Sequence, residues 1–123
     1  MTTADKIVAL ELERLSVDFV SQLPVQLREV ESEFAAWLDA PQDAARFEIL
    51  SHRVHQLKGS GSTFGCPGVS RAARTLEKSL GAYRQEIDAG RQPAPEAVES
   101  ALTSLQNEAR RARAQSPDAE ANP

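Results

Sequence analysis

Residues 19–38 have the sequence FVSQLPVQLREVESEFAAWL, in which apolar side chains recur every three or four positions. This spacing places them along one face of an α-helix, because one helical turn takes about 3.6 residues. The stripe consists of Phe19, Val20, Leu23, Leu27, Val30, Phe34, Trp37 and Leu38. Pro24 lies within it and removes one backbone donor, so the helix either kinks there or follows a shorter helix that ends before it. We expect residues 4–15 to form that shorter N-terminal helix.

Three more apolar stripes with helical spacing follow, and segments that contain glycine or proline separate them. The second stripe follows Asp43, a candidate N-cap, and contains Phe47, Leu50, Val54, Leu57, Gly61 and Phe64. The third begins after residues 65–68 and contains Val69, Ala72, Ala73, Leu76, Leu80, Tyr83 and Ile87. The fourth follows Pro95, which suits the first turn of a helix, and contains Val98, Ala101, Leu102 and Leu105.

Four amphipathic helices joined by short loops predict an all-α, antiparallel up-down four-helix bundle, with the short N-terminal helix as a cap. We expect the bundle to occupy residues 4–114. Arg110, Arg111 and Arg113 suit the end of the last helix, where positive charges complement the helix dipole. Residues 115–123 offer almost nothing to bury, so a disordered C-terminal tail is predicted.

The composition excludes several classes of protein. The chain has 123 residues, enough for one domain, and a net charge of −4, which disfavours binding to nucleic acid. No apolar run approaches the ~20 residues that cross a bilayer, and no signal peptide is visible. The only cysteine, Cys66, excludes an internal disulfide. We therefore expect a cytoplasmic monomer with protein partners and no membrane contact, and the initial methionine and the polar tail favour a free-standing protein over a piece of a larger one.

The segment His55-Gln56-Leu57-Lys58-Gly59-Ser60-Gly61-Ser62-Thr63-Phe64-Gly65 keeps the helical apolar spacing but contains three glycines. Each glycine inside a helix costs about 0.5–1 kcal/mol relative to alanine, so Gly59 and Gly61 indicate close packing or a functional surface. On a helical wheel Gly61 lies within the buried stripe, where it lets a neighbouring helix approach closely. Gly59 lies about 40° from His55, outside that stripe.

The wheel also predicts an exposed His55, because this residue lies about 140° from the centre of the buried stripe. Lys58 and Gly59 are three and four residues further on and share its side of the helix. An exposed nucleophile, a nearby cation and an open approach path suit phosphoryl transfer between proteins. An alternative is a zinc site, since Glu48, His52 and His55 share a face, although no fourth ligand is evident.

These residues resemble the signature of histidine-containing phosphotransfer (HPt) domains of bacterial phosphorelays. The resemblance covers roughly residues 8–110 and rests on His55-Gln56-Leu57-Lys58-Gly59-Ser60, Phe64-Gly65, Leu76-Glu77, Phe19-Val20, Leu23-Pro24 and Leu27. One difference is Gly61, where members of the family commonly have a second small residue such as serine. The resemblance implies a four-helix bundle with an exposed phosphorylated histidine.

The resemblance also implies a function. His55 would accept a phosphoryl group at Nε2 from a receiver-domain aspartate, or along a histidine kinase pathway, and pass it to another receiver aspartate. Lys58 would offset the phosphoryl charge, and Gly59 would allow the partner to approach. We expect no base beside His55, no ATP site and no cofactor, with Mg²⁺ supplied by the receiver. Helical geometry adds a partner surface at Ser51, His52, Gln56 and Ser62, and the alternative function is an adaptor or inhibitor that accepts no phosphate.

Overall fold

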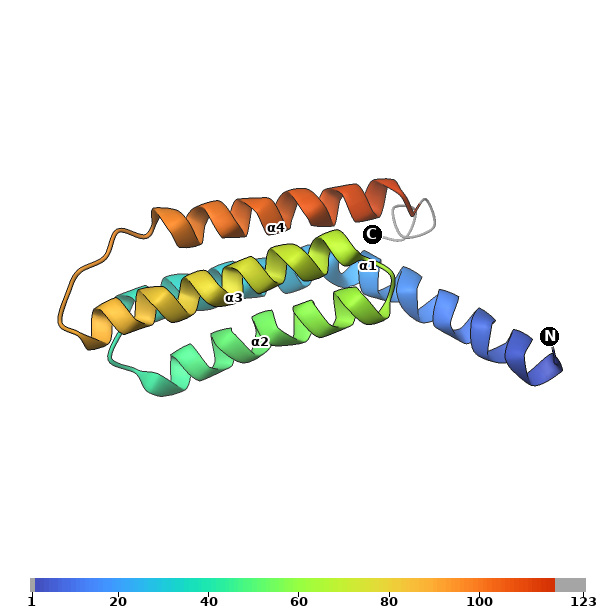
Figure 1. The fold of residues 1–123 in the computed structure, drawn as a ribbon, viewed down its shortest axis with the longest axis horizontal. Coiled ribbons are helices and arrows are strands. Elements are labelled where there is room, and N and C mark those ends of the chain that lie inside the picture. The colour runs from blue at the N-terminus through green and yellow to red at the C-terminus, as the bar shows by residue number, and fades with distance from the viewer. Residues whose placement is uncertain (1, 117–123) are drawn as a thin grey trace.

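The computed structural model describes residues 2–116 and contains four helices in this range, with no strand. The helices are α1 (Thr3–Asp39), α2 (Ala44–Thr63), α3 (Pro67–Asp88) and α4 (Glu96–Ala114). Contacts join α1 to α2, α2 to α3, α3 to α4 and α4 back to α1, so the helices close a ring around one core (Figure 1). The predicted all-α four-helix bundle is therefore confirmed.

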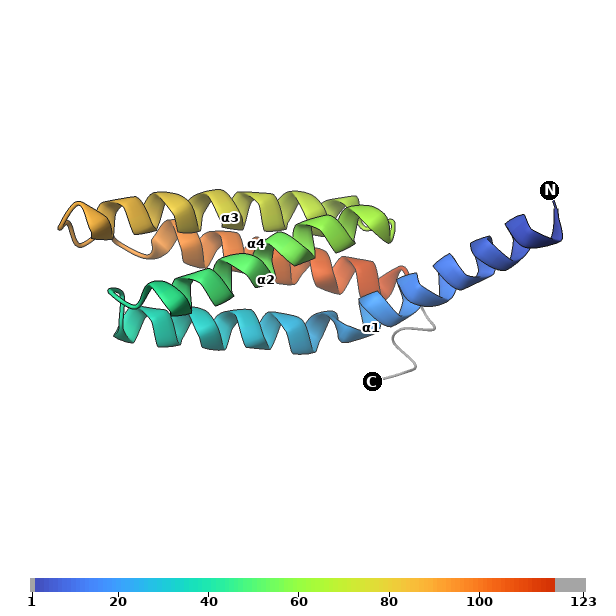
Figure 2. The same cartoon turned by 90° about the horizontal axis from the view of Figure 1, so that it is seen from below.

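The prediction of a separate N-terminal helix is wrong, because residues 4–15 form the first turns of α1. No glycine or proline interrupts the chain between Thr2 and Pro24, and Pro24 itself lies inside the helix. A capping box between Thr2 and Asp5 begins the helix. This part of α1 extends beyond the bundle and does not cap it, and α1 changes direction where it leaves the other helices (Figure 2).

The extension of α1 presents apolar side chains to solvent. Its exposed large residues are Ile7, Val8, Leu10, Leu12 and Leu15. Further along the same helix, Leu23 is 0% exposed and Trp37 is 1% exposed. The apolar stripe of α1 is therefore buried only from Phe19 onward, where α2 and α4 pack against this helix.

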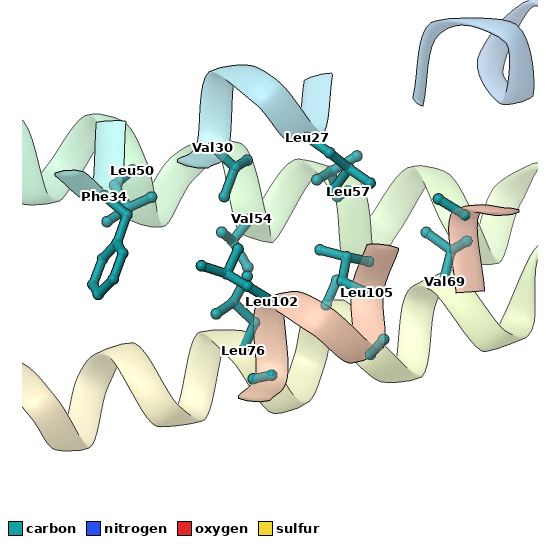
Figure 3. Packing of buried hydrophobic residues seen from close by; sticks show 14 of the residues in the cluster. Leu27, Val30, Phe34, Leu50, Val54, Leu57, Val69, Leu76, Leu102 and Leu105 are labelled. Atoms are coloured by element: carbon teal, nitrogen blue, oxygen red, sulfur yellow. The ribbon is translucent and has the colours of Figure 1, made fainter. Parts of the chain in front are cut away.

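The core takes apolar side chains from all four helices, and the described residues include no buried polar or charged side chain. Figure 3 shows Leu27, Val54, Leu76 and Leu105, one from each helix, converging on the middle of the bundle. Burial of one such side chain contributes about 1.5–3 kcal/mol to folding. The stripes predicted from the sequence form this core, with Leu38, Phe64, Tyr83 and Ile87 only partly buried at its edge.

The predicted helix ends are close to those observed. Asp43 caps α2 as predicted, and its side chain accepts hydrogen bonds from the backbone of Ala45 and Arg46. Pro95 is the N-cap residue of α4, one position before the first turn in which it was expected. The predicted basic last turn of α4 is confirmed. Of the predicted tail, residues 117–123 lie outside the described range.

None of the helices in the described part of the chain combines the length and the apolar character that crossing a membrane requires.

Candidate functional site

His55 lies on the outer face of α2. Its neighbours Val54 and Leu57 are 0% and 3% exposed and fix the orientation of the helix against the core. The side chain of His55 is 64% exposed. The predicted exposure of this imidazole is therefore confirmed.

Glu77 of α3 contacts the imidazole. Nδ1 of His55 lies 2.8 Å from Oε2 of Glu77. An ionised carboxylate can only accept hydrogen bonds, so Nδ1 carries the ring hydrogen and donates a hydrogen bond to Glu77. In the neutral ring this leaves the lone pair on Nε2, the other ring nitrogen. The expectation that no base lies beside His55 is therefore wrong.

Lys58 binds the other oxygen of the same carboxylate. Its Nζ lies 2.9 Å from Oε1 of Glu77, and the two side chains are 25% and 28% exposed. The hydrogen bond from Lys58 is the main cause that lowers the pKa of Glu77 below its ordinary value. Partial burial raises this pKa, and the hydrogen bond from His55 lowers it further. Glu77 is therefore ionised at neutral pH and holds both residues.

Close packing of α2 against α3 brings Glu77 within reach of His55. A Cβ atom at Gly61 would lie 2.9 Å from the backbone nitrogen of Ser70, closer than real contacts allow. The hydroxyl of Ser70 donates a 2.7 Å hydrogen bond to the carbonyl oxygen of Lys58. The predicted role of Gly61, to let a neighbouring helix approach, is confirmed.

Gly59 leaves the other side of His55 open. A Cβ atom at Gly59 would have no heavy atom within 4 Å, as its predicted exposed position requires. A groove of about 740 Å³ runs here between α1 and α2, lined by residues that include Val25, Leu57, Gly59 and Phe64. His55 also lines this groove. The imidazole therefore has the Lys58–Glu77 ion pair on the α3 side and an open groove on the α1 side.

The other predicted site residues surround His55 on α2. His52, Gln56 and Ser62 are exposed, and Ser51 is half-buried. Within residues 2–116, none of these four side chains forms a hydrogen bond or an ion pair. The structure therefore assigns them no role in the site. Their contribution to partner binding stays a prediction.

The zinc alternative finds no support in residues 2–116, where no three His, Cys, Asp or Glu side chains group closely enough to hold a metal ion. Glu48 instead lies 3.9 Å from Arg84 of α3. Cys66 is half-buried in the turn before α3, and burial raises the pKa of its thiol. Cys66 therefore remains protonated at neutral pH.

Glu77 is the site residue whose role the sequence did not reveal. The pair Leu76-Glu77 belongs to the motif that the chain shares with a known family, but no spacing rule connects residue 77 to residue 55. Only the packing of α3 on α2 shows that Glu77 meets both His55 and Lys58.

Comparison with known proteins gives one match. The family described as Hpt domain matches residues 14–115, which include all four helices apart from residues 3–13 of α1. No curated protein and no solved structure matches the chain.

Proposed function

The chain belongs to the Hpt domain family, whose members are phosphocarriers in two-component signalling, and we propose that His55 is the residue that carries the phosphoryl group here. The observation that carries this proposal is the hydrogen bond from Nδ1 of His55 to Glu77, which leaves Nε2 with the lone pair. His52, the only other histidine of the chain, has no such partner among residues 2–116. Of the two histidines, His55 alone is oriented for reaction.

The proposed reaction transfers a phosphoryl group without change of oxidation state. The lone pair of Nε2 attacks the phosphorus of an aspartyl phosphate on a receiver domain, and an N–P bond forms. The P–O bond to the aspartate breaks, and the aspartate leaves as a carboxylate. The reverse steps pass the phosphoryl group to the aspartate of a second receiver, so the carrier is regenerated.

Glu77 supports this reaction through charge. When Nε2 bonds to phosphorus while Nδ1 keeps its proton, the ring becomes positive. The carboxylate of Glu77, 2.8 Å from Nδ1, stabilises this positive ring. Glu77 is a positioning residue, because it contacts the imidazole and not the phosphoryl group.

Lys58 has two roles in the proposal. Its ion pair with Glu77 keeps that carboxylate ionised. Its ammonium also adds positive charge one helical turn from His55, where the phosphoryl group brings about two negative charges. The alignment and the neutralisation of charge that phosphoryl transfer requires therefore come from neighbouring side chains.

The partner approaches over the open side of the ring. Gly59 and the groove between α1 and α2 leave room beside His55 for the partner's aspartate, and Gln56 and Ser62 lie on the same exposed part of α2. We expect the receiver to supply Mg²⁺ and its own acidic pocket. In this proposal the chain uses no ATP of its own and works as a cytoplasmic monomer.

Phosphoryl transfer from a labelled receiver tests the proposal. The wild type and His52→Gln should acquire a label that is stable in base and labile in acid, and His55→Gln should acquire none. His52→Gln is the matched control, since it removes the other exposed imidazole from the same helix. A label that persists on His55→Gln would contradict the proposal. Binding of the receiver without labelling of the wild type would favour the adaptor instead.

A further inference from the structure

We propose that Arg71, Arg74 and Lys78 of α3 form a docking surface for an acidic face of the partner receiver domain. These three residues are called the α3 basic stripe below. The inference rests on the proposed function and adds to it the chemistry by which the partner is recognised.

The first observation is an uneven distribution of charge along the chain. Residues 51–81 contain five lysines and arginines and one glutamate, a net charge of +4. Since the whole chain has a net charge of −4, the remaining residues together carry −8. The segment that contains the reactive histidine is therefore the basic part of an acidic protein.

The second observation is that the cations of the stripe have no partners. Arg71, Arg74 and Lys78 are exposed, and none of them forms an ion pair with a residue in the described range 2–116. By contrast, Arg53 of α2 is bound by Glu29 and Glu33 of α1, each at 2.6 Å. Arg53, which links α2 to α1, is thus paired, while the cations of the stripe remain available to another molecule.

The third observation is the position of the stripe. Its residues are three and four positions apart, so they share one face of α3. Glu77 lies between Arg74 and Lys78 in the sequence and holds His55 and Lys58 across the α2–α3 contact. The stripe therefore lies on the same stretch of α3 as Glu77, the residue that contacts the imidazole, and not on the groove between α1 and α2.

The one negative charge within residues 51–81 is already neutralised. Glu77 is the only acidic residue within residues 51–81, and it bonds to Lys58 and His55. A partner that brings carboxylates toward His55 therefore meets unopposed positive charge on α3. A long polyanion such as DNA would also meet the acidic remainder of the chain, so the charge distribution favours a compact acidic protein face.

Such a surface acts mainly on the rate of association. Complementary charge on two proteins raises the association rate constant by about 10- to 1000-fold at low salt, and salt removes this gain. The stripe is thus expected to speed encounters with phosphorylated receivers and to have little influence on the bond-forming step at His55.

The test compares two double variants that change the net charge equally. Arg74→Glu/Lys78→Glu reverses the stripe. Lys6→Glu/Arg110→Glu reverses two exposed cations elsewhere, on the extension of α1 and on α4, a helix that does not contact α2. The second-order rate constant for phosphoryl transfer from a phosphorylated receiver is measured in low and high salt.

Labelling by phosphoramidate, a small donor that needs no docking, is measured in parallel. Circular dichroism verifies that both variants fold.

The expected result is a rate constant about tenfold or more lower for the stripe variant at low salt, with a difference that shrinks in high salt. The control should stay within about twofold of the wild type, because its charges lie far from His55. Phosphoramidate should label both variants alike.

Two results would overturn the inference. One is a stripe variant that transfers as fast as the control. The other is a stripe variant that also loses phosphoramidate labelling, since the stripe would then act on His55 and not on docking. Failure of the proposed function would look different, because the wild type itself would take no label on His55 from either donor.

Discussion

Nδ1 of His55 lies 2.8 Å from Oε2 of Glu77, although the two residues are 22 positions apart in the sequence and belong to different helices. The other carboxylate oxygen of Glu77 binds Lys58. One side chain of α3 thereby fixes the tautomer of the histidine and pairs with the cation one turn away on α2. The site that the family membership implies is built across the α2–α3 contact and not on α2 alone.

The first prediction concerns Glu77. Glu77→Ala should slow phosphoryl transfer to His55 by about one to two orders of magnitude, the range found when carboxylates that orient metal-binding histidines are removed. Glu77→Gln keeps an acceptor for the Nδ1 proton and should retain more activity than Glu77→Ala. Long-range nitrogen–proton NMR shows which ring nitrogen carries the proton. An unchanged tautomer and an unchanged rate in Glu77→Ala would contradict the positioning role.

The second prediction concerns the pKa of Glu77. Lys58→Met removes the main cause of its lowered value, so the pKa should rise toward the ordinary value, as measured by carboxyl NMR titration. Lys78→Met is the control. Lys78 follows Glu77 directly on α3, and the structure of residues 2–116 shows no ion pair or hydrogen bond between their side chains. A pKa that moves equally in both variants would show that the direct ion pair is not the cause.

The lowered pKa of Glu77 also gives a sign for the dependence of stability on pH. The unfolded chain binds the proton of Glu77 more tightly than the folded chain. The contribution of Glu77 to stability is therefore fully present above about pH 4.3, the ordinary value for glutamate. It is lost as the pH falls through the lower pKa of the folded state. In Lys58→Met the pKa of the folded state lies closer to the ordinary value, so this loss should be smaller and complete at higher pH, as measured by urea unfolding at several pH values.

The third prediction compares two glycines of α2. Gly61→Ala should lower the free energy of unfolding by about 1–3 kcal/mol, because its Cβ would press on the backbone of α3. Gly59→Ala should raise it by about 0.5–1 kcal/mol, because alanine favours helix and the space around Gly59 is open. Chemical denaturation of both variants measures the two effects. If both substitutions changed the free energy of unfolding in the same direction, the packing described for Gly61 would be contradicted.

The fourth prediction tests the open approach to His55. Gly59→Gln should strongly reduce transfer from a phosphorylated receiver while the helical circular dichroism stays the same, because the new side chain fills the space beside the imidazole. Labelling by phosphoramidate should continue, since this donor is small. A normal rate of transfer from the receiver would exclude a role for Gly59 in the approach of the partner.

The fifth prediction concerns the two parts of α1. Leu23 is 0% exposed and Leu12 is 46% exposed, although the helical spacing of 11 residues places both on the same side of this helix. Leu23→Ala should cost about 2–5 kcal/mol of folding free energy. Leu12→Ala should change it by less than about 0.5 kcal/mol. Thermal and urea unfolding provide the measurement, and a large loss in Leu12→Ala would mean that the extension is covered in solution.

The sequence by itself determined the features that depend on helical periodicity. It predicted the four stripes of the core, the exposed His55, the open Gly59 and the buried Gly61, because the direction of a side chain on a helix follows from its position alone. The family of the chain could also be inferred from its sequence, through the motif around His55.

The tertiary structure decided what depends on the distance between helices. The partner of His55 and Lys58 is Glu77, and no local rule gives that contact, because it requires the register of α3 on α2 that Gly61 and Ser70 permit. The sequence predicts a separate N-terminal helix because proline is typical of helix ends, and this prediction is wrong. A proline inside a helix removes one hydrogen bond, and packing of the turns on either side maintains the helix across it.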